Sequence, residues 1–248
     1  MKVIDARNKR VLVIPDLHIP FEHPDSLKFV SAVYNDLALK DGTRPEDVIV
    51  INLGDEIDGH TISFHKNDPD IPYSPGKELE KAIEHIEDWY RQFPHKILLE
   101  SNHGSLVYRR AKDQGIPLHY IKSYQEILNT PTWEWHEDVL LKTKMGDIYL
   151  CHGKTSATGK LSKEMGTYGA IQGHFHGKFQ VTWSTTATGT RFDAFSGCLI
   201  DRQSLAFAYG KNHIPKPILG CLLISKMGYP QMIKMVTDDR DRWIWELP

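Results

Sequence analysis

Two kinds of hydrophobic pattern alternate along the first hundred residues. Apolar runs at residues 11–15 and 48–53 are rich in Val, Ile and Leu and have the length of a buried strand, and residues 96–100 (KILLE) form a third short strand pattern. Between them, residues 24–40 and 77–93 place apolar side chains at the three- and four-residue spacing of an amphipathic helix. The order strand, helix, strand, helix, strand predicts parallel strands joined by crossover helices.

The pattern changes after residue 130. Short strand-like runs then follow one another with turn residues between them, at residues 138–144, 147–153, 169–175, 178–184, 191–197, 219–225 and 229–236. This spacing is typical of antiparallel strands, so it predicts a second sheet that packs on the first. The sequence shows no internal repeat and no linker, and we expect a single domain over residues 1–248.

Composition narrows the class of protein. The chain is 40% hydrophobic and 25% charged with a net charge of -2, which is typical of a globular protein and gives no overall attraction to nucleic acid. No apolar run approaches the ~18 residues of a membrane-spanning helix, so we expect a cytoplasmic protein without a membrane partner. Cys151, Cys198 and Cys221 are far apart and lack CxxC spacing, which predicts buried free thiols.

Five of the predicted strands end in polar side chains that can bind metal. The clusters are Asp16 with His18, Asp55 with Asp58, Asn102 with His103, His152, and His174 with His176. Any one of them alone is more typical of a turn or a helix cap. Because the carboxyl ends of strands border the ligand crevice in α/β sheets, we expect the clusters to converge. Their oxygen donors and imidazoles suffice for two borderline metal ions that share one carboxylate.

In their order, DxH, GDxxD, NH, HG and GHxH, these blocks resemble the signature of the calcineurin-like metallophosphoesterases, over residues 16–176. The resemblance implies an α/β fold, a four-layer αββα sandwich of mixed sheets, with a dimetal site at the edge of both sheets. It also implies two ligand sets that share Asp55: Asp16, His18, Asp55 and His176 for one metal, and Asp55, Asn102, His152 and His174 for the other.

The same resemblance implies the cofactors and the reaction. Two divalent ions are expected, with manganese first and Fe, Zn, Ni or Co also suited to these ligands. The implied activity is hydrolysis of a phosphoric ester by in-line attack of a hydroxide that bridges the metals. His103 is the implied catalytic residue at the leaving oxygen, and Asp58 is the carboxylate that orients it. The alternative for Asp58 is a turn residue ahead of Gly59.

The third block departs from the family pattern. Ser101 stands where the family usually has Gly, and Gly104 stands where it has Asp or Glu. Gly59 and Gly104 also replace an Arg and a Glu that are typical of the protein serine/threonine phosphatases. A protein phosphatase is therefore a less favoured alternative.

Four further residues are candidates for substrate binding. If the segment after Gly104 is helical, Arg109 or Arg110 could contact phosphate, because the guanidinium group binds phosphate through two hydrogen bonds; the alternative is a solvated helix face. His60 and His65 lie in the loop that follows the second block and could approach a substrate.

The leading functional hypothesis is a phosphomonoesterase that acts on a small phosphorylated compound such as a nucleotide. A phosphodiesterase or nuclease with the same site is the first alternative, although the mildly acidic chain offers nucleic acid little attraction. A non-catalytic metal-binding scaffold is the alternative from a different functional class.

Overall fold

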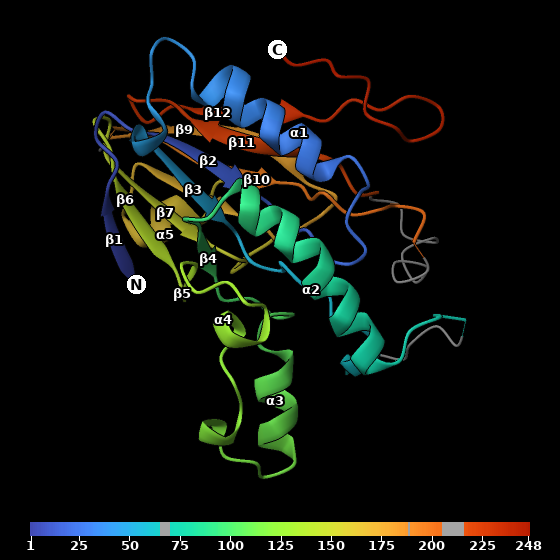
Figure 1. The fold of residues 1–248 in the computed structure, drawn as a ribbon. Helices are drawn as coiled ribbons and strands as arrows, with labels where there is room; N and C mark the ends of the chain where they lie inside the picture. Colours follow the sequence, from blue (N-terminus) through green and yellow to red (C-terminus); the bar gives the residue numbers. More distant parts are fainter. Residues whose placement is uncertain (65–69, 188, 205–215) are drawn as a thin grey trace.

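Two six-stranded mixed sheets stack face to face in the computed structural model, which describes residues 1–64, 70–187, 189–204 and 216–248 (Figure 1). The first sheet has the order β12 (Pro230–Lys234), β11 (Gly220–Ile224), β2 (Arg10–Ile14), β3 (Val48–Asn52), β4 (Ile97–Leu99) and β5 (Glu134–His136). The second has the order β1 (Lys2–Asp5), β6 (Val139–Lys142), β7 (Asp147–Cys151), β8 (Gly169–Gln172), β10 (Gly189–Ser196) and β9 (Phe179–Thr186).

The predicted parallel order of the first three strands is confirmed. β2, β3 and β4 run parallel, and β5 extends them in the same direction. The second sheet is mixed: β6 pairs antiparallel with β7, whereas β7, β8 and β10 run parallel. β1 and β5 were not among the predicted strands.

The late strands form most of the predicted second sheet, but β11 and β12 belong to the first sheet instead. β11 pairs antiparallel with β2 and closes that side of the first sheet, and β12 pairs outside β11. All five residues of β11 are buried, because this strand lies between two neighbours and is covered on both faces. An apolar run of this kind indicates a central strand but does not identify the sheet that contains it.

The continuous apolar character of β2 follows from its two covered faces. Val11 and Val13 point into the core between the sheets, while Leu12 and Ile14 point toward the helices. Side chains alternate across a strand, so a strand covered on both sides needs apolar residues at every position.

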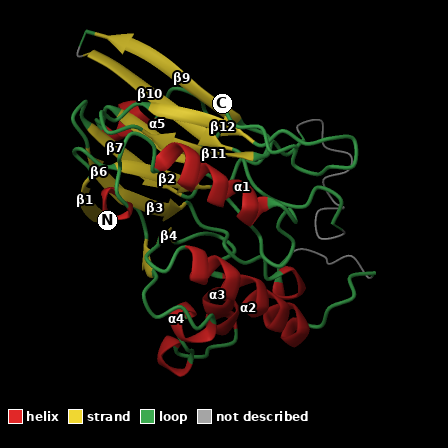
Figure 2. Cartoon of the chain, turned by 45° about the horizontal axis from the view of Figure 1, so that its top comes forward, coloured by secondary structure: helices red, strands yellow, loops and turns green. Residues whose placement is uncertain are grey.

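Helices cover the outer faces of both sheets, which confirms the predicted fold class (Figures 1 and 2). The first sheet is covered by α1 (Ser26–Ala32), which continues into a π-helical segment (Val33–Ala38), and by α2 (Pro75–Gln92). The layer on the second sheet is thin: α5 (Leu161–Met165) packs there against β7, β8 and β10. Two helices, α3 (Leu106–Asp113) and α4 (Tyr124–Ile127), project beside β4 and β5.

Two expectations about the residues themselves can be checked directly. All three cysteines are free and buried, as predicted. None of the helices in the described ranges is both long and apolar enough to cross a membrane.

Candidate metal centre

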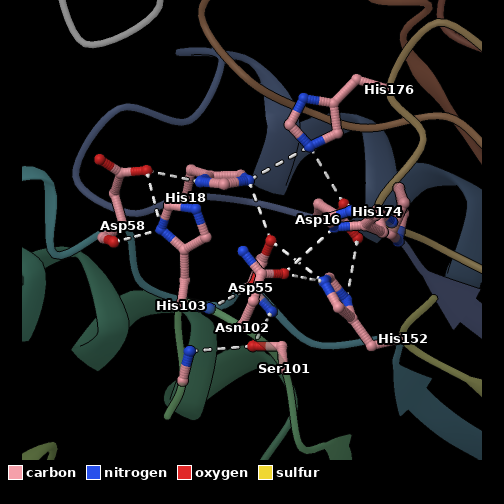
Figure 3. A network of polar contacts seen from close by, with 12 residues as sticks. Asp16, His18, Asp55, Asp58, Ser101, Asn102, His103, His152, His174 and His176 are labelled. Atoms are coloured by element: carbon pink, nitrogen blue, oxygen red, sulfur yellow. Dashed lines mark hydrogen bonds and ion pairs between the residues drawn. The ribbon is translucent and has the colours of Figure 1, made fainter. Parts of the chain in front are cut away.

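The five polar clusters meet at one edge of the two sheets (Figure 3). The first sheet contributes the residues that follow β2, β3 and β4, and the second contributes those that follow β7 and β8. The sequence prediction of convergence at the carboxyl ends of the strands is therefore confirmed. Four candidate ligands, Asp16, His18, Asp55 and His152, are at most 7% exposed.

The first set of candidate ligands closes around one point. His176 Nε2 lies 3.1 Å from Asp16 Oδ2 and 3.2 Å from His18 Nε2, and His18 Nε2 lies 3.4 Å from Asp55 Oδ2. One ligand atom from each of these four residues falls within 4.8 Å of the others. These are the four residues that the family resemblance assigns to one metal.

The second set lies on the other side of Asp55. His152 Nε2 is 3.3 Å from Asp55 Oδ2 and 2.6 Å from Asn102 Oδ1, and His174 Nδ1 is 3.1 Å from the same amide oxygen. Asp55 Oδ2 is therefore close to a histidine of each set. This is the position that a bridging carboxylate requires.

Backbone conformation at three of these residues is unusual. The φ angle is 55° at His18, 47° at Asp55 and 65° at His174, all in the left-handed region that non-glycine residues rarely adopt. Such conformations cost of order 1–3 kcal/mol each and persist where the surrounding structure enforces them, frequently at functional sites.

The glycine before His174 is required by close packing. A Cβ atom on Gly173 would lie 2.4 Å from Asp16 Oδ1, so any side chain there would displace a candidate ligand. The backbone N–H of His174 donates to Asp16 Oδ2 at 2.7 Å. This contact fixes the Gly173–His174 segment of the second sheet against the Asp16 loop of the first.

Hydrogen bonds orient the histidines so that a cation fits between them. His152 Nδ1 lies 2.9 Å from the carbonyl oxygen of Leu53, which can only accept, so Nδ1 carries the proton. The other ring nitrogen of a neutral His152, Nε2, then faces the oxygens of Asn102 and Asp55 with a lone pair. These atoms all accept, so a cation between them would stabilise the arrangement. Asp16 Oδ1 is also buried without a hydrogen-bond partner.

The pKa shifts of His152 and Asp55 also indicate that the site favours a positive charge. Burial opposes a charge on His152, yet the nearby carboxylates of Asp55 and Asp16 raise its pKa to about 9. Burial alone would raise the pKa of Asp55, but the facing imidazoles, His152 foremost, hold it well below its usual range. A proton on His152 and a divalent ion are alternative ways to supply the same missing charge. The donor set and the orphaned oxygen of Asp16 thus fit two divalent metal ions.

Asp58 lies between two imidazoles. Its Oδ1 is 2.5 Å from His18 Nδ1 and 3.4 Å from His103 Nδ1, whereas the Asp58 backbone carbonyl accepts a hydrogen bond from His103 Nδ1. The hypothesis placed Asp58 beside His103, and the structure adds a closer contact with His18. Both the side chain and the backbone of Asp58 therefore face the histidines of the site.

Three of the four candidate substrate contacts are in the described ranges, and they already have partners within the protein. Arg109, on the predicted helix that is now α3, donates to the Asn102 carbonyl at 2.5 Å, and Arg110 donates to the Ile62 carbonyl at 2.8 Å. His60 Nδ1 lies 3.7 Å from Asp58 Oδ2. His65 is outside the described residues.

Two residues that sequence reasoning did not assign to the site support its loops. Ser101 Oγ accepts hydrogen bonds from the Asp55 and Gly104 N–H groups, at 2.9 Å each, and so ties the second block to the third. The buried Glu78 of α2 accepts from the N–H groups of His60 and Thr61 at 2.6 and 2.8 Å. Only the departure of Ser101 from the family pattern gave a signal in the sequence.

Comparison with known proteins adds similarity of fold. No family profile and no curated protein sequence matches the chain. Vps29 from Chaetomium thermophilum is similar in structure, with TM-score 0.46 and 10% identity over 97% of this chain and 92% of that one. A protein serine/threonine phosphatase from Saccharomyces cerevisiae with similarity to human phosphatase PP5 gives TM-score 0.41 and 10% identity, over 96% of this chain and 84% of that one.

Likeness at these values carries no conclusion about activity or substrate. The molecule itself has two stacked mixed sheets, with clustered His and Asp side chains at one sheet edge. This arrangement is the one that the resemblance of the five sequence blocks to the calcineurin-like metallophosphoesterases implies.

Proposed function

We propose that the protein is a dimetal-dependent phosphoric ester hydrolase, a phosphomonoesterase that acts on a small phosphorylated compound such as a nucleotide. The observation that carries the proposal is the pair of ligand sets on either side of Asp55, each with at least three donor side chains. When bound, two divalent ions would supply Lewis-acid stabilisation of phosphate oxygens and an activated water.

A side chain of the protein would then protonate the leaving group. The Asp58 carbonyl holds the His103 Nδ1–H, which leaves Nε2 as the nitrogen that can transfer a proton to the departing oxygen. Burial lowers the pKa of His103, but the charges of Asp55 and Asp58 outweigh it and raise the pKa overall. An imidazolium is the form that a general acid needs.

The part of the chain that follows the last sequence block favours a small substrate. The strands that follow His176, β9 to β12, all belong to the two sheets. Within the described ranges they form neither a capping domain nor a nucleic-acid-binding extension. A phosphodiester substrate would use the same metals and is the alternative to test.

The test is a hydrolysis panel with chelated protein reloaded with one metal at a time. Substrates are an aryl monoester, an aryl diester, nucleoside monophosphates, a phosphopeptide and single-stranded DNA. We expect metal-dependent turnover with preference for a monoester. Preference for the diester or DNA would replace the monoesterase with the alternative. Metal binding without turnover of any substrate would instead identify a scaffold.

A pair of variants tests the role of His103. We expect His103→Ala to retain the metal content of the wild type while the rate falls by about a hundredfold or more, the usual contribution of a general acid. His95→Ala, at an exposed histidine that is not a candidate site residue, is the matched control and should keep its activity. Near-wild-type activity of the His103 variant would show that the assigned role is wrong.

A further inference from the structure

A cavity of about 660 Å³ lies beside the loop that carries Asn102 and His103. Gly104 and Ser105, which directly follow His103, form part of its wall, and most of the rest comes from α3, α4 and β5. Its volume is within the range of small-molecule binding sites. The side chains that determine its chemistry are Glu100, Tyr108, Tyr124, Glu134, Trp135 and His136.

Three aromatic rings form a continuous wall of the cavity. Tyr108 meets Tyr124 edge to face at a centroid distance of 5.6 Å, and Tyr124 stacks on Trp135 at 6.4 Å and 24°. The faces of such rings carry negative electrostatic potential, so they attract cations as well as apolar groups.

Charge in the lining has one sign. Apart from His136, the acidic or basic side chains in the lining are the carboxylates Glu100 and Glu134. No Lys or Arg is among the described residues that line the cavity. Glu134 already accepts from Lys2 Nζ at 3.1 Å and from His136 Nε2 at 2.9 Å. No ion pair or hydrogen bond of the Glu100 side chain occurs within the described part of the chain. A phosphate group would be repelled here, which separates this cavity from the metal centre.

A buried acceptor without a donor lies next to the wall. Glu56 is fully buried, and its Oε1 accepts from Trp135 Nε1 at 3.1 Å, but its Oε2 has no hydrogen-bond partner. A Cβ atom on Gly104 would lie 3.7 Å from that Oε2. The Glu56 carboxyl group therefore lies behind the cavity wall, next to Trp135 and the Gly104 backbone, and does not itself line the cavity.

We propose that this cavity binds a small organic cation, an amine with an apolar or aromatic body. The three rings would contact the body and the cationic head by cation–π interaction, and Glu100 would supply the unpaired carboxylate. The site is independent of the proposed phosphoesterase activity, because no candidate metal ligand lines it.

Binding of three probes of nearly equal shape tests the proposal. Phenethylamine is protonated at neutral pH, phenylethanol is neutral and phenylacetate is negative; each is titrated into the metal-free protein by calorimetry. We expect the amine to bind at least about tenfold more tightly than the alcohol, the factor given by one cation–π contact or unpaired carboxylate. Phenylacetate should bind more weakly than either.

Variants locate the binding in the cavity. Glu100→Gln and Tyr108→Ala should each reduce the affinity for phenethylamine about fivefold to tenfold. Glu137→Gln is the matched control, because Glu137 is exposed and lies outside the cavity, and it should leave the affinity unchanged. Equal affinity for amine and alcohol, no binding of the amine, or an unchanged affinity in Glu100→Gln would each overturn the proposal.

Discussion

Lys96 gives the sharpest prediction about stability, because a charged side chain is buried there without a salt bridge. It is 2% exposed, its Nζ lies 3.7 Å from the ring centroid of Trp133 and 5.5 Å from that of Trp89, and Nζ has no hydrogen-bond partner. Burial, opposed in part by Glu56, lowers the pKa of Lys96 from 10.5 to about 7. The perturbation that we propose is Lys96→Met, which keeps the length of the stem and removes the amine.

The magnitude follows from the pKa difference between the unfolded and the folded chain. At 1.36 kcal/mol per pKa unit, a change from 10.5 to about 7 corresponds to a cost of about 5 kcal/mol near neutral pH. We therefore expect Lys96→Met to raise the free energy of unfolding by up to about 5 kcal/mol below pH 7.

The pH dependence has a definite sign. The folded chain releases the Lys96 proton near pH 7, whereas the unfolded chain keeps it up to pH 10.5. Between these values the unfolded state binds more protons, so the stability of the wild type rises with pH relative to that of Lys96→Met. The advantage of the variant should therefore shrink steadily from pH 7 toward pH 10.

Chemical denaturation followed by circular dichroism, with a chelator present, measures both quantities. Lys122→Met, at an exposed lysine, is the matched control and should change the free energy of unfolding by less than about 0.5 kcal/mol. A variant at position 96 that is less stable than the wild type at pH 6, or a difference that does not vary with pH, would refute the reasoning.

Three further predictions follow from contacts in the structure. Ser101→Ala leaves the Asp55 and Gly104 N–H groups without an acceptor and should cost about 1–3 kcal/mol in thermal or chemical unfolding; an unchanged stability would contradict the bracing role. Asp55→Asn should reduce the metal content, measured by elemental analysis after gel filtration, for both ions together; the loss of only one ion would argue against a bridging role. The Arg242 hydrogen bonds lower the pKa of Asp25 to about 2, so their contribution is present above pH 3.8 and is lost as pH falls toward 2. Asp25→Asn should therefore remove about 1 kcal/mol at pH 6 and abolish this acid-induced loss, and an equal pH slope in both proteins would disprove it.

The sequence allowed most of the candidate site to be predicted. Each ligand lies directly after a strand, and the end of a buried apolar run can be recognised locally. Spacing such as Asp16 with His18 is also local. The convergence of the five clusters follows from a general property of parallel strands, whose carboxyl ends meet at one edge.

Other features required contacts between residues far apart in the chain. The run at β11 is equally apolar whichever sheet contains it, and only its pairing with β2 decides. Asp58 is near His103 in the family pattern, yet its closer side-chain contact is His18, forty residues earlier. The Ser101 hydroxyl accepts a hydrogen bond from the Asp55 N–H group, and no local sequence pattern indicates this contact.

The sequence by itself indicated most of the strands and the candidate metal ligands at their ends, because these depend on apolar periodicity and on side-chain type. Only the tertiary structure decided which sheet each late strand joins, which histidines share Asp58, and that an acidic aromatic cavity lies beside the His103 loop. The physical reason is that pairing, burial and cavity shape arise between segments that are distant along the chain, and a local pattern is compatible with several such arrangements.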